Sequence, residues 1–395
     1  MTQIRGRARR WQSFAETVFT EFTALAVAHR AINLGQGSPG FDGPEFVKAA
    51  AAAAIARGDN QYAPMSGIPQ LREVIASRFA AATGIAVDPD DNVTVTSGCA
   101  EALAASFLGM VDPGDEVVLI EPFYDLYPAG IAMAGATARH VTLRPPAFRL
   151  DETDLAGVVG PRTRMIVLNT PHNPVGRVFD RAELELVASV AAANDAVVVS
   201  DEVYEHLVFE GEHVSIASLP GMWERTVTLS SLGKTFSLTG WKVGWAVGPA
   251  HLTDAVRAAH QFITFAVPTP LQHGAVAALA APPEYFTEFV AGYRRRRDLL
   301  VEGLAAAGFG VQPPQGTYFV LADHTPFGFT DDVSFARHLT TEIGVGAIPP
   351  SAFYDDPGDG ATLIRFAFCQ PEEVLAEAVR RLGALRLTLR AAAPS

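Results

Sequence analysis

Short apolar runs rich in β-branched residues alternate with longer helical patterns through the middle of this chain. The runs stand at residues 93–96, 116–120, 165–168, 197–199, 226–229 and 243–247. Helical patterns separate most of them, for example at 100–110, 182–193 and 250–265. Strands that are apolar almost without interruption are buried on both faces, as in a parallel sheet covered by helices. The pattern therefore predicts an α/β domain over residues 47–285.

The two ends of the chain carry a different pattern. A helical stretch and a loop rich in glycine and proline occupy residues 1–46. A long helical pattern at 285–307 is followed by short strands at 318–321 and 363–368 and by a closing helix at 371–387. We predict that residues 286–395 form a smaller α+β domain, and that the N-terminal arm, residues 1–46, contributes to it.

The composition is that of a globular protein, and the net charge restricts the kinds of molecule that the protein could bind. Its 395 residues are enough for one large core and a smaller one. Hydrophobic residues make up 49% and charged residues 18%, which excludes a disordered chain. The net charge of −13 argues against a nucleic-acid partner, because such binding needs clustered positive charge. The only basic run, 294–297, has Asp298 beside it and is better explained as a solvated helix face.

The cysteine count and the N-terminal sequence indicate the cellular compartment in which the protein is expected. Two cysteines, Cys99 and Cys369, are too few for a disulfide framework and favour a reducing compartment. No apolar segment approaches the roughly 18 residues of a membrane-spanning helix, and the arginine-rich N-terminus lacks the apolar core of a signal peptide. We therefore expect a soluble cytoplasmic protein with no membrane partner, most simply an enzyme or a ligand binder, and predict no metal site.

Four of the predicted strands end in polar or glycine-rich turns. Open α/β sheets bind ligands at the carboxyl ends of their strands, so these turns should converge. The first is Ser97-Gly98-Cys99, where free amides at a helix N-terminus could bind phosphate, although an ordinary turn explains it better when taken alone. The second is a rigid turn from which the Asn173 amide could donate to a ligand oxygen, with a purely structural turn as the alternative. His172 beside it is more simply a capping or bystander residue than a general base.

The other two turns carry charge directly after buried strands. Asp201 needs a positive or N–H partner, which either a cofactor ring nitrogen or a structural salt bridge would supply. Lys234 stands among small and aromatic residues, where burial would lower its pKa and make the amine nucleophilic. Lys242 keeps a second cation within reach. The alternative, two lysines that extend to solvent, fits the composition of this segment poorly.

Taken together, the four turns fit a single ligand. Pyridoxal 5′-phosphate (PLP) needs a lysine for its Schiff base, an acid at its pyridine nitrogen and a cradle for its phosphate. With its ring nitrogen protonated, PLP withdraws electrons and stabilises the carbanion that remains when the substrate Cα proton departs.

These turns also carry a resemblance to a known family. The segment SLGKTFSLTGWKVGW at 231–245 resembles the fold-type I PLP-dependent aminotransferases of class I/II, and NPVG at 173–176 and DEVY at 201–204 have the order and spacing of that family. The similarity extends from Phe14 to Leu385. Within the class, the chain most resembles the kynurenine/glutamine and N-succinyldiaminopimelate aminotransferases, through NLGQG at 33–37, EPFYD at 121–125, GTYF at 316–319, IPPSAFY at 348–354 and IRF at 364–366.

The resemblance implies a fold and a set of roles. The fold is a mostly parallel seven-stranded sheet between helices, as in aspartate aminotransferase, with a smaller α+β domain, and the assembly is a homodimer. Lys234 would hold the cofactor as a Schiff base and shuttle the proton at Cα, and Asp201 would pair with the pyridinium nitrogen. The other cofactor contacts would be Tyr124 on the ring face, Asn173 and Tyr204 at the ring hydroxyl, and Gly98, Cys99, Ser231, Lys242 and the partner's Tyr62 at the phosphate. The substrate carboxylate would bind Arg365, with Asn173 and the Gly35 backbone beside it.

The sequence also supports the role of Arg365 in binding a carboxylate without reference to the resemblance. Alternation along the strand puts Ile364, Phe366 and Phe368 on one face and Arg365 on the other. A guanidinium suits a carboxylate because it donates two parallel hydrogen bonds. An exposed salt bridge is the alternative.

The predicted activity is amino transfer between an L-amino acid and a 2-oxo acid. Relatives carry an aromatic residue, proline and aspartate after the Gln-Gly pair, whereas this chain has Ser38, Pro39 and Gly40, which is expected to open the pocket. That departure motivates a second hypothesis, in which the same cofactor site catalyses β- or γ-elimination, replacement or carbon–carbon bond formation. A regulator that uses this fold as a sensor is a third hypothesis, but only 32 residues precede Asn33, too few for a DNA-binding domain.

Overall fold

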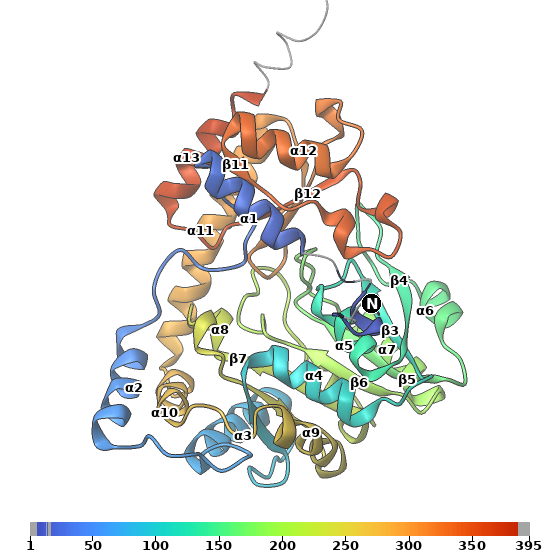
Figure 1. Cartoon of the computed structure of the whole chain (residues 1–395), viewed down its shortest axis with the longest axis vertical. Coiled ribbons are helices and arrows are strands. Elements are labelled where there is room, and N and C mark those ends of the chain that lie inside the picture. Colours follow the sequence, from blue (N-terminus) through green and yellow to red (C-terminus); the bar gives the residue numbers. More distant parts are fainter. Residues whose placement is uncertain (1–5, 13, 15–16, 386–395) are drawn as a thin grey trace, which may run out of the picture.

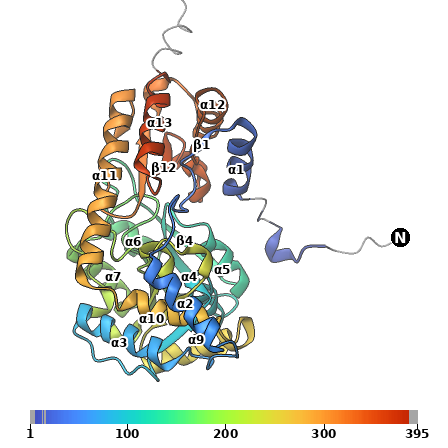
Figure 2. The same cartoon turned by 90° about the vertical axis from the view of Figure 1, so that its left-hand side faces the viewer.

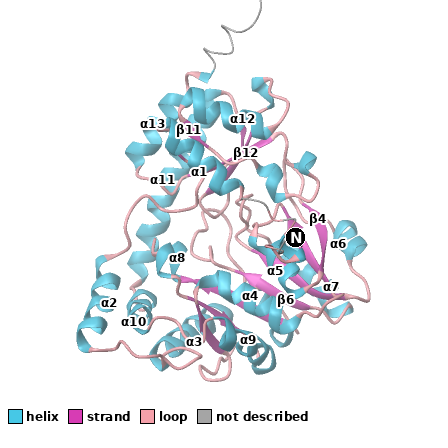
Figure 3. Ribbon diagram, in the orientation of Figure 1, coloured by secondary structure: helices cyan, strands magenta, loops and turns pink. Residues whose placement is uncertain are grey.

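A seven-stranded sheet lies at the centre of the computed structural model, which describes residues 6–12, 14 and 17–385 (Figures 1 and 3). In spatial order the strands are β2 (Val93–Thr96), β8 (Gly244–Val247), β7 (Thr226–Ser231), β6 (Val197–Asp201), β5 (Thr163–Asn169), β3 (Glu116–Glu121) and β4 (Thr137–Thr142). All of them share one direction except β8, which is antiparallel to both of its neighbours. The predicted α/β class and mostly parallel sheet are therefore confirmed, while β4 was not predicted.

Helices cover both faces of this sheet because successive strand residues point to opposite sides. Val117 and Leu119 enter one core, and Val118 and Ile120 enter the other. The first core is closed by α4 (Gly98–Met110), α5 (Leu126–Ala134) and α9 (Ala250–Ile263), and the second by α6 (Glu152–Val158) and α7 (Arg181–Ala193). Burial on both faces explains why these strands are apolar almost throughout.

Three more helices pack at the β2 and β8 edge. They are α2 (Glu45–Arg57), α3 (Pro69–Thr83) and α10 (Thr269–Leu279), which form a third core with Val95 and Trp245. Local sequence fixes where several helices begin and end. At α7, the Asp180 side chain accepts from the Glu183 amide while the Glu183 side chain accepts from the Asp180 amide, which is a capping box.

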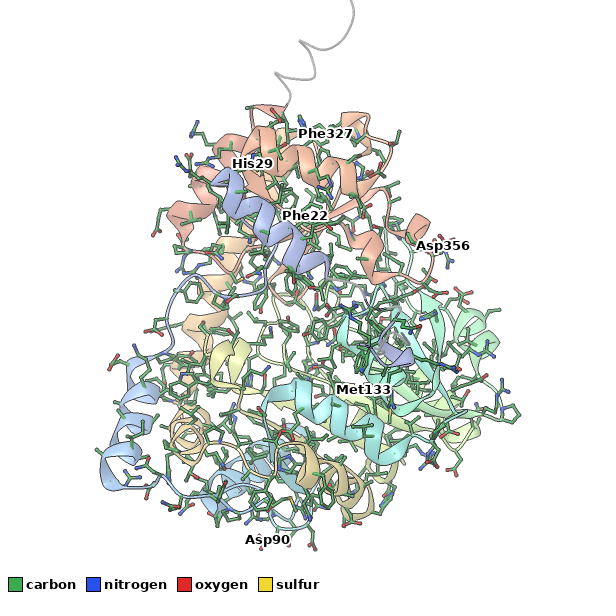
Figure 4. All side chains as sticks on the ribbon, viewed as in Figure 1. Phe22, His29, Asp90, Met133, Phe327 and Asp356 are labelled. Carbon is green, nitrogen blue, oxygen red and sulfur yellow. The ribbon has the colours of Figure 1, made fainter. Side chains whose placement is uncertain are left out.

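The C-terminal part is a separate layer joined by the N-terminal segment. Helix α1 (Val18–His29) packs there, and strand β1 (Ile32–Asn33) pairs in parallel with β11 (Val345–Gly346). Figures 1 and 2 show α1 beside α12 (Asp332–His338), and Figure 4 marks Phe22 and Phe327 in this layer. Its other elements are α11 (Pro283–Ala307), β9 (Gly310–Val311), β10 (Phe319–Asp323), α12 (Asp332–His338), β12 (Leu363–Ala367) and α13 (Glu372–Leu382).

Two strands of this layer carry residues toward the central sheet. Strand β10 pairs antiparallel with both β9 and β12, so that Leu321 lies opposite Arg365. The predicted closing helix starts within one residue of the expected position, but α13 ends at Leu382, and the expected end at Leu387 lies outside the described residues. No helix within 6–12, 14 and 17–385 is long and apolar enough to cross a membrane.

Candidate active site

Four strand ends meet at one edge of the central sheet, as the sequence predicted. Gly244, at the start of β8, pairs with Thr96 of β2 on one side and with Ser231 of β7 on the other. Asn169 at the end of β5 pairs with Asp201 at the end of β6. The carboxyl ends of the parallel strands and the amino end of β8 therefore share this edge.

A cavity of about 380 Å³ opens at this edge. Every residue that was predicted to touch the cofactor or the substrate lines it, except Tyr62 and Gly35. Gly35 lies beside the cavity, because its carbonyl accepts a hydrogen bond of 2.8 Å from Arg365. Both layers of the molecule contribute walls, since Gln36 and Phe319 line the cavity opposite the sheet residues.

Lys234 sits in α8 (Leu232–Thr235), the single helical turn that follows β7. Its Nζ donates a hydrogen bond to the Tyr318 hydroxyl at 3.0 Å, and that hydroxyl donates to the Gly37 carbonyl at 2.6 Å. Burial lowers the pKa of Lys234, which favours the neutral, nucleophilic amine. The alternative in which the Lys234 side chain extends to bulk solvent is wrong.

Asp201 is a buried carboxylate, 4% exposed, whose described hydrogen-bond donors are all neutral. The Tyr127 hydroxyl donates to Oδ2 at 2.8 Å, while the Val203 amide at 3.3 Å and the Cys99 thiol at 3.6 Å donate to Oδ1. Burial raises the pKa of Asp201 despite these hydrogen bonds. A structural salt bridge, the alternative raised from the sequence, is therefore wrong, and the carboxylate suits a cation that enters the cavity.

The first turn of α4 is shaped to admit an anion. Gly98 has a φ of +72°, and a Cβ atom on it would lie 3.3 Å from Cε of Lys242. A Cβ atom on Gly244 would lie 2.5 Å from the carbonyl carbon of Gly98, so two glycines allow these backbones to approach. The free amides of the first turn of α4, the helix dipole and the Lys242 ammonium together favour a phosphate here, with Ser231 beside them.

Asn169 fixes the next turn, although the sequence assigned it no role. Its Oδ1 accepts from the Asn173 amide at 2.7 Å, and its Nδ2 donates to the Asp201 carbonyl at 2.9 Å. Asn173, Tyr124 and Tyr204 line the same cavity as Asp201. A flat ligand that reaches Asp201 would thus meet two aromatic rings and a side-chain amide.

His172 is not available as a general base. Its ring stacks against Phe179 with centroids 5.7 Å apart, and it does not line the cavity. Burial, together with the nearby Arg177, lowers the pKa of His172 to about 3. The ring is therefore neutral, as its interpretation as a bystander requires.

Arg365 is a buried cation without a described carboxylate partner. It is 2% exposed, and its guanidinium lies 4.3 Å from the Phe319 ring centroid. One terminal nitrogen donates to the Gly35 carbonyl at 2.8 Å, the other reaches Asn173 Oδ1 at 3.4 Å, and Nε has no described partner. Burial lowers the pKa of Arg365 to about 10. The alternative raised from the sequence, an exposed salt bridge, is wrong, because Arg365 is buried. A buried charge of this kind favours an anionic ligand.

The loop that departs from the family pattern is held against the end of β12. Ser38 lines the cavity. A Cβ atom on Gly40 would collide with the Gln370 side chain, whose amide donates to the Ser38 carbonyl at 3.3 Å. In this chain, Gln370 thus occupies the space that a side chain at residue 40 would fill.

Tyr62 stands apart from this cavity. It is 85% exposed, and its ring packs edge-on against Phe265 with centroids 5.7 Å apart. Its predicted contact is with the cofactor of a partner subunit, and the position on the surface is compatible with that prediction.

Besides Asn169, two tyrosines that contact the predicted site residues were missed by the sequence analysis. Tyr127 binds Asp201 and Tyr318 binds Lys234, yet neither was assigned a role. Tyr318 lies inside the GTYF motif, and Tyr127 lies two residues beyond the EPFYD motif. Both motifs thus indicated segments near the site, but neither identified the tyrosine hydroxyls that bind Asp201 and Lys234.

Comparison with known proteins places this geometry in a family. Residues 29–382 match the model of the family described as aminotransferase class I and II. The chain is 45% identical over 387 residues to a probable N-succinyldiaminopimelate aminotransferase of Mycobacterium tuberculosis, covering 95% of this chain and 98% of the relative. It is 43% identical over 370 residues to the methionine aminotransferase of Escherichia coli, covering 93% of this chain and 96% of the relative.

A solved structure agrees in fold as well as in sequence. The N-succinyldiaminopimelate aminotransferase from Mycobacterium tuberculosis superposes with a TM-score of 0.94 at 45% identity, covering 96% of this chain and all of that one. The resemblance inferred from the Lys234 segment is thereby confirmed. The chain belongs to the class I and II aminotransferases, a family of PLP-dependent transferases.

Proposed function

We propose that this protein transfers an amino group from an L-amino acid to a 2-oxo acid with PLP held at the cavity. The observation that carries the proposal concerns Arg365, a buried guanidinium with no ion-pair partner among the described residues, which lines the same cavity of about 380 Å³ as the amine of Lys234. A substrate with a carboxylate next to an amino group matches that pair, because the fork of Arg365 binds the carboxylate while the amine acts at Cα.

The cavity residues fit PLP. Asp201, buried among neutral donors, would pair with the pyridinium nitrogen, and the first turn of α4 with Ser231 and Lys242 would hold the phosphate. Tyr124 would pack on the ring face, and Asn173 and Tyr204 would bind the ring hydroxyl. When bound, PLP supplies the electron sink that makes the Cα proton acidic.

Lys234 is the proposed base and acid at Cα. Its lowered pKa keeps the amine available in its neutral form. Tyr318 holds the Nζ atom with a hydroxyl that is itself anchored to the Gly37 carbonyl. This chain of two hydrogen bonds orients the amine toward the cavity, where it would carry a proton between Cα and the cofactor carbon.

The experiment is a single turnover without an amino acceptor. PLP-loaded protein is mixed with each member of a panel of amino acids, including methionine and N-succinyl-diaminopimelate, the substrates that relatives are named for. We expect one equivalent of 2-oxo acid per site and the cofactor in its amine form for at least one donor. A product that retains its amino group, or release of ammonia without the amine form, would contradict amino transfer and favour the elimination or replacement chemistry.

We also propose a homodimer in which Tyr62 reaches the partner's cavity. Large apolar side chains are exposed at the end of α9 and just after it: Phe262 is 86% exposed, and Ile263 and Phe265 are each 46% exposed. Exposed apolar side chains that adjoin one another are typical of an interface. Phe265 contacts Tyr62 directly, so the patch and the proposed partner contact are one surface.

Glutamate in place of Phe262 should weaken self-association by about 30-fold or more, because a buried charge replaces an aromatic anchor. Sedimentation equilibrium measures the dissociation constant. Val27→Glu is the matched control, since Val27 is 74% exposed on α1, outside this patch. Equal dissociation constants for wild type and Phe262→Glu would contradict the assignment of the surface.

A further inference from the structure

A buried pair of opposite charges lies under the first turn of α4. Glu101 Oε1 is 2.7 Å from Nδ1 of His260, and the two residues are 7% and 0% exposed. Glu101 Oε2 accepts a close hydrogen bond from the Ser97 amide. The other ring nitrogen of His260, Nε2, is 2.9 Å from the Met65 carbonyl. The pair thus ties α4, α9 and the loop before α3 to the turn that forms the proposed phosphate cradle.

The contacts of His260 define its protonation state. A carbonyl and an ionised carboxylate only accept hydrogen bonds. With Glu101 ionised, both ring nitrogens of His260 therefore donate, which only the imidazolium can do. The electrostatic balance agrees. Burial is the largest single influence and disfavours both charges. The hydrogen bond and the charge attraction between the two residues, with the backbone hydrogen bonds to Met65 and Ser97, together outweigh it, raising the pKa of His260 and lowering that of Glu101. The pair is therefore an imidazolium and a carboxylate.

The position of the carboxylate raises an electrostatic problem for an anion. Glu101 lies in the first turn of α4, three residues after Gly98, and its carboxylate holds the amide just before the proposed phosphate-binding turn. A single negative charge there would repel a phosphate dianion, and low dielectric surroundings would strengthen the repulsion. The His260 imidazolium cancels that charge from the side of Glu101 that faces α9.

We propose that His260 is a positioning residue for the cofactor phosphate: it neutralises Glu101 so that Glu101 can hold the Ser97 turn without repelling the phosphate. The inference rests on the proposed function, because it takes the first turn of α4 as the phosphate site. It predicts an effect that depends on the phosphate rather than on the ring, since His260 and Glu101 do not line the cavity.

Equilibrium dialysis of the apoprotein at pH 6.5, where the raised pKa keeps His260 protonated, compares binding of PLP with binding of pyridoxal, which lacks the phosphate. His260→Gln leaves the Glu101 charge unbalanced and should weaken PLP binding by about tenfold or more, with the pyridoxal dissociation constant changed less than about twofold. The double variant Glu101→Gln/His260→Gln removes both charges and should bind PLP within about threefold of wild type. His273→Gln is the control, because it removes a histidine from a partly exposed pair with Asp59, 3.4 Å away.

Two results would overturn the proposal. Equal weakening of PLP and pyridoxal binding by His260→Gln would assign the pair a structural role only, and so would a double variant as weak as the single one. If His260→Gln does not fold, as judged by circular dichroism, Glu101→Gln decides: it should bind PLP at least as tightly as wild type, and weaker PLP binding with unchanged pyridoxal binding refutes the proposal. Failure of the wild type itself to bind PLP would instead refute the proposed function.

Discussion

Alanine in place of Lys234 should lower turnover by about 10⁴-fold or more, because one side chain supplies both the covalent attachment and the proton transfer. The surroundings of Lys234 favour the neutral amine and fix the position of its Nζ atom. Burial lowers its pKa, and the Tyr318 hydroxyl fixes Nζ at 3.0 Å. No other lysine has these surroundings in the described chain: Lys242 is exposed beside Gly98, and Lys48 is paired on the surface with Asp42 and Glu45.

The measurement combines kinetics with chemical trapping. Borohydride reduction of the PLP-loaded protein, followed by digestion and mass spectrometry, should place the cofactor on the Lys234 peptide in wild type and on no peptide in Lys234→Ala. Lys48→Ala is the control and should keep both the adduct and the turnover. An adduct of full stoichiometry on Lys242 in the wild type would remove the basis of the proposed mechanism.

Much of the fold was predictable because strands that are buried on both faces of a sheet have apolar residues at almost every position. Val197 and Val199 face one core and Val198 the other, so the whole strand must be apolar. Strand β4 was missed for the opposite reason. As an edge strand it keeps much of its surface exposed, and of its residues only Val141 is buried. The antiparallel direction of β8 could not be predicted either, since hydrophobic periodicity does not encode strand direction.

The site was predictable wherever chemistry follows directly on a strand end. The carboxyl-edge rule joins Gly98, Asn173, Asp201 and Lys234 without any knowledge of side-chain contacts. Tyr127 and Tyr318 were not identified from the sequence because their roles depend only on tertiary contacts. Each hydroxyl meets its partner across a long stretch of chain, 74 residues for Tyr127 and Asp201 and 84 for Tyr318 and Lys234.

Arg365 shows most clearly what the sequence leaves open. Alternation along the strand predicted its face but not whether a carboxylate of the protein would meet it. That depends on how β12 packs against the loop at Gly35, which is a tertiary arrangement. The structure surrounds the guanidinium with the rings of Phe19, Phe319 and Phe353, at 5.1, 4.3 and 5.1 Å, and with neutral oxygens. The charge therefore costs folding free energy in the absence of an anion.

Methionine in place of Arg365 should consequently move activity and stability in opposite directions. Loss of a buried, forked contact to the substrate carboxylate should lower kcat/KM by about 10²–10³-fold, mainly through KM. Removal of an unpaired buried charge should raise the melting temperature of the substrate-free protein by roughly 2–8 °C. Steady-state kinetics and calorimetry of the same preparations measure both.

Arg365→Lys separates charge from geometry. It keeps the cation but loses the fork, so it should recover only part of the affinity, leaving kcat/KM about 10–100-fold below wild type, and none of the gain in melting temperature. A methionine variant that is less stable than wild type and unchanged in KM would mean that Arg365 stabilises the loop at Gly35 rather than binding substrate. Opposed shifts in the two quantities are what distinguish a side chain retained for a ligand from one retained for the fold, because only the former is destabilising until its ligand arrives.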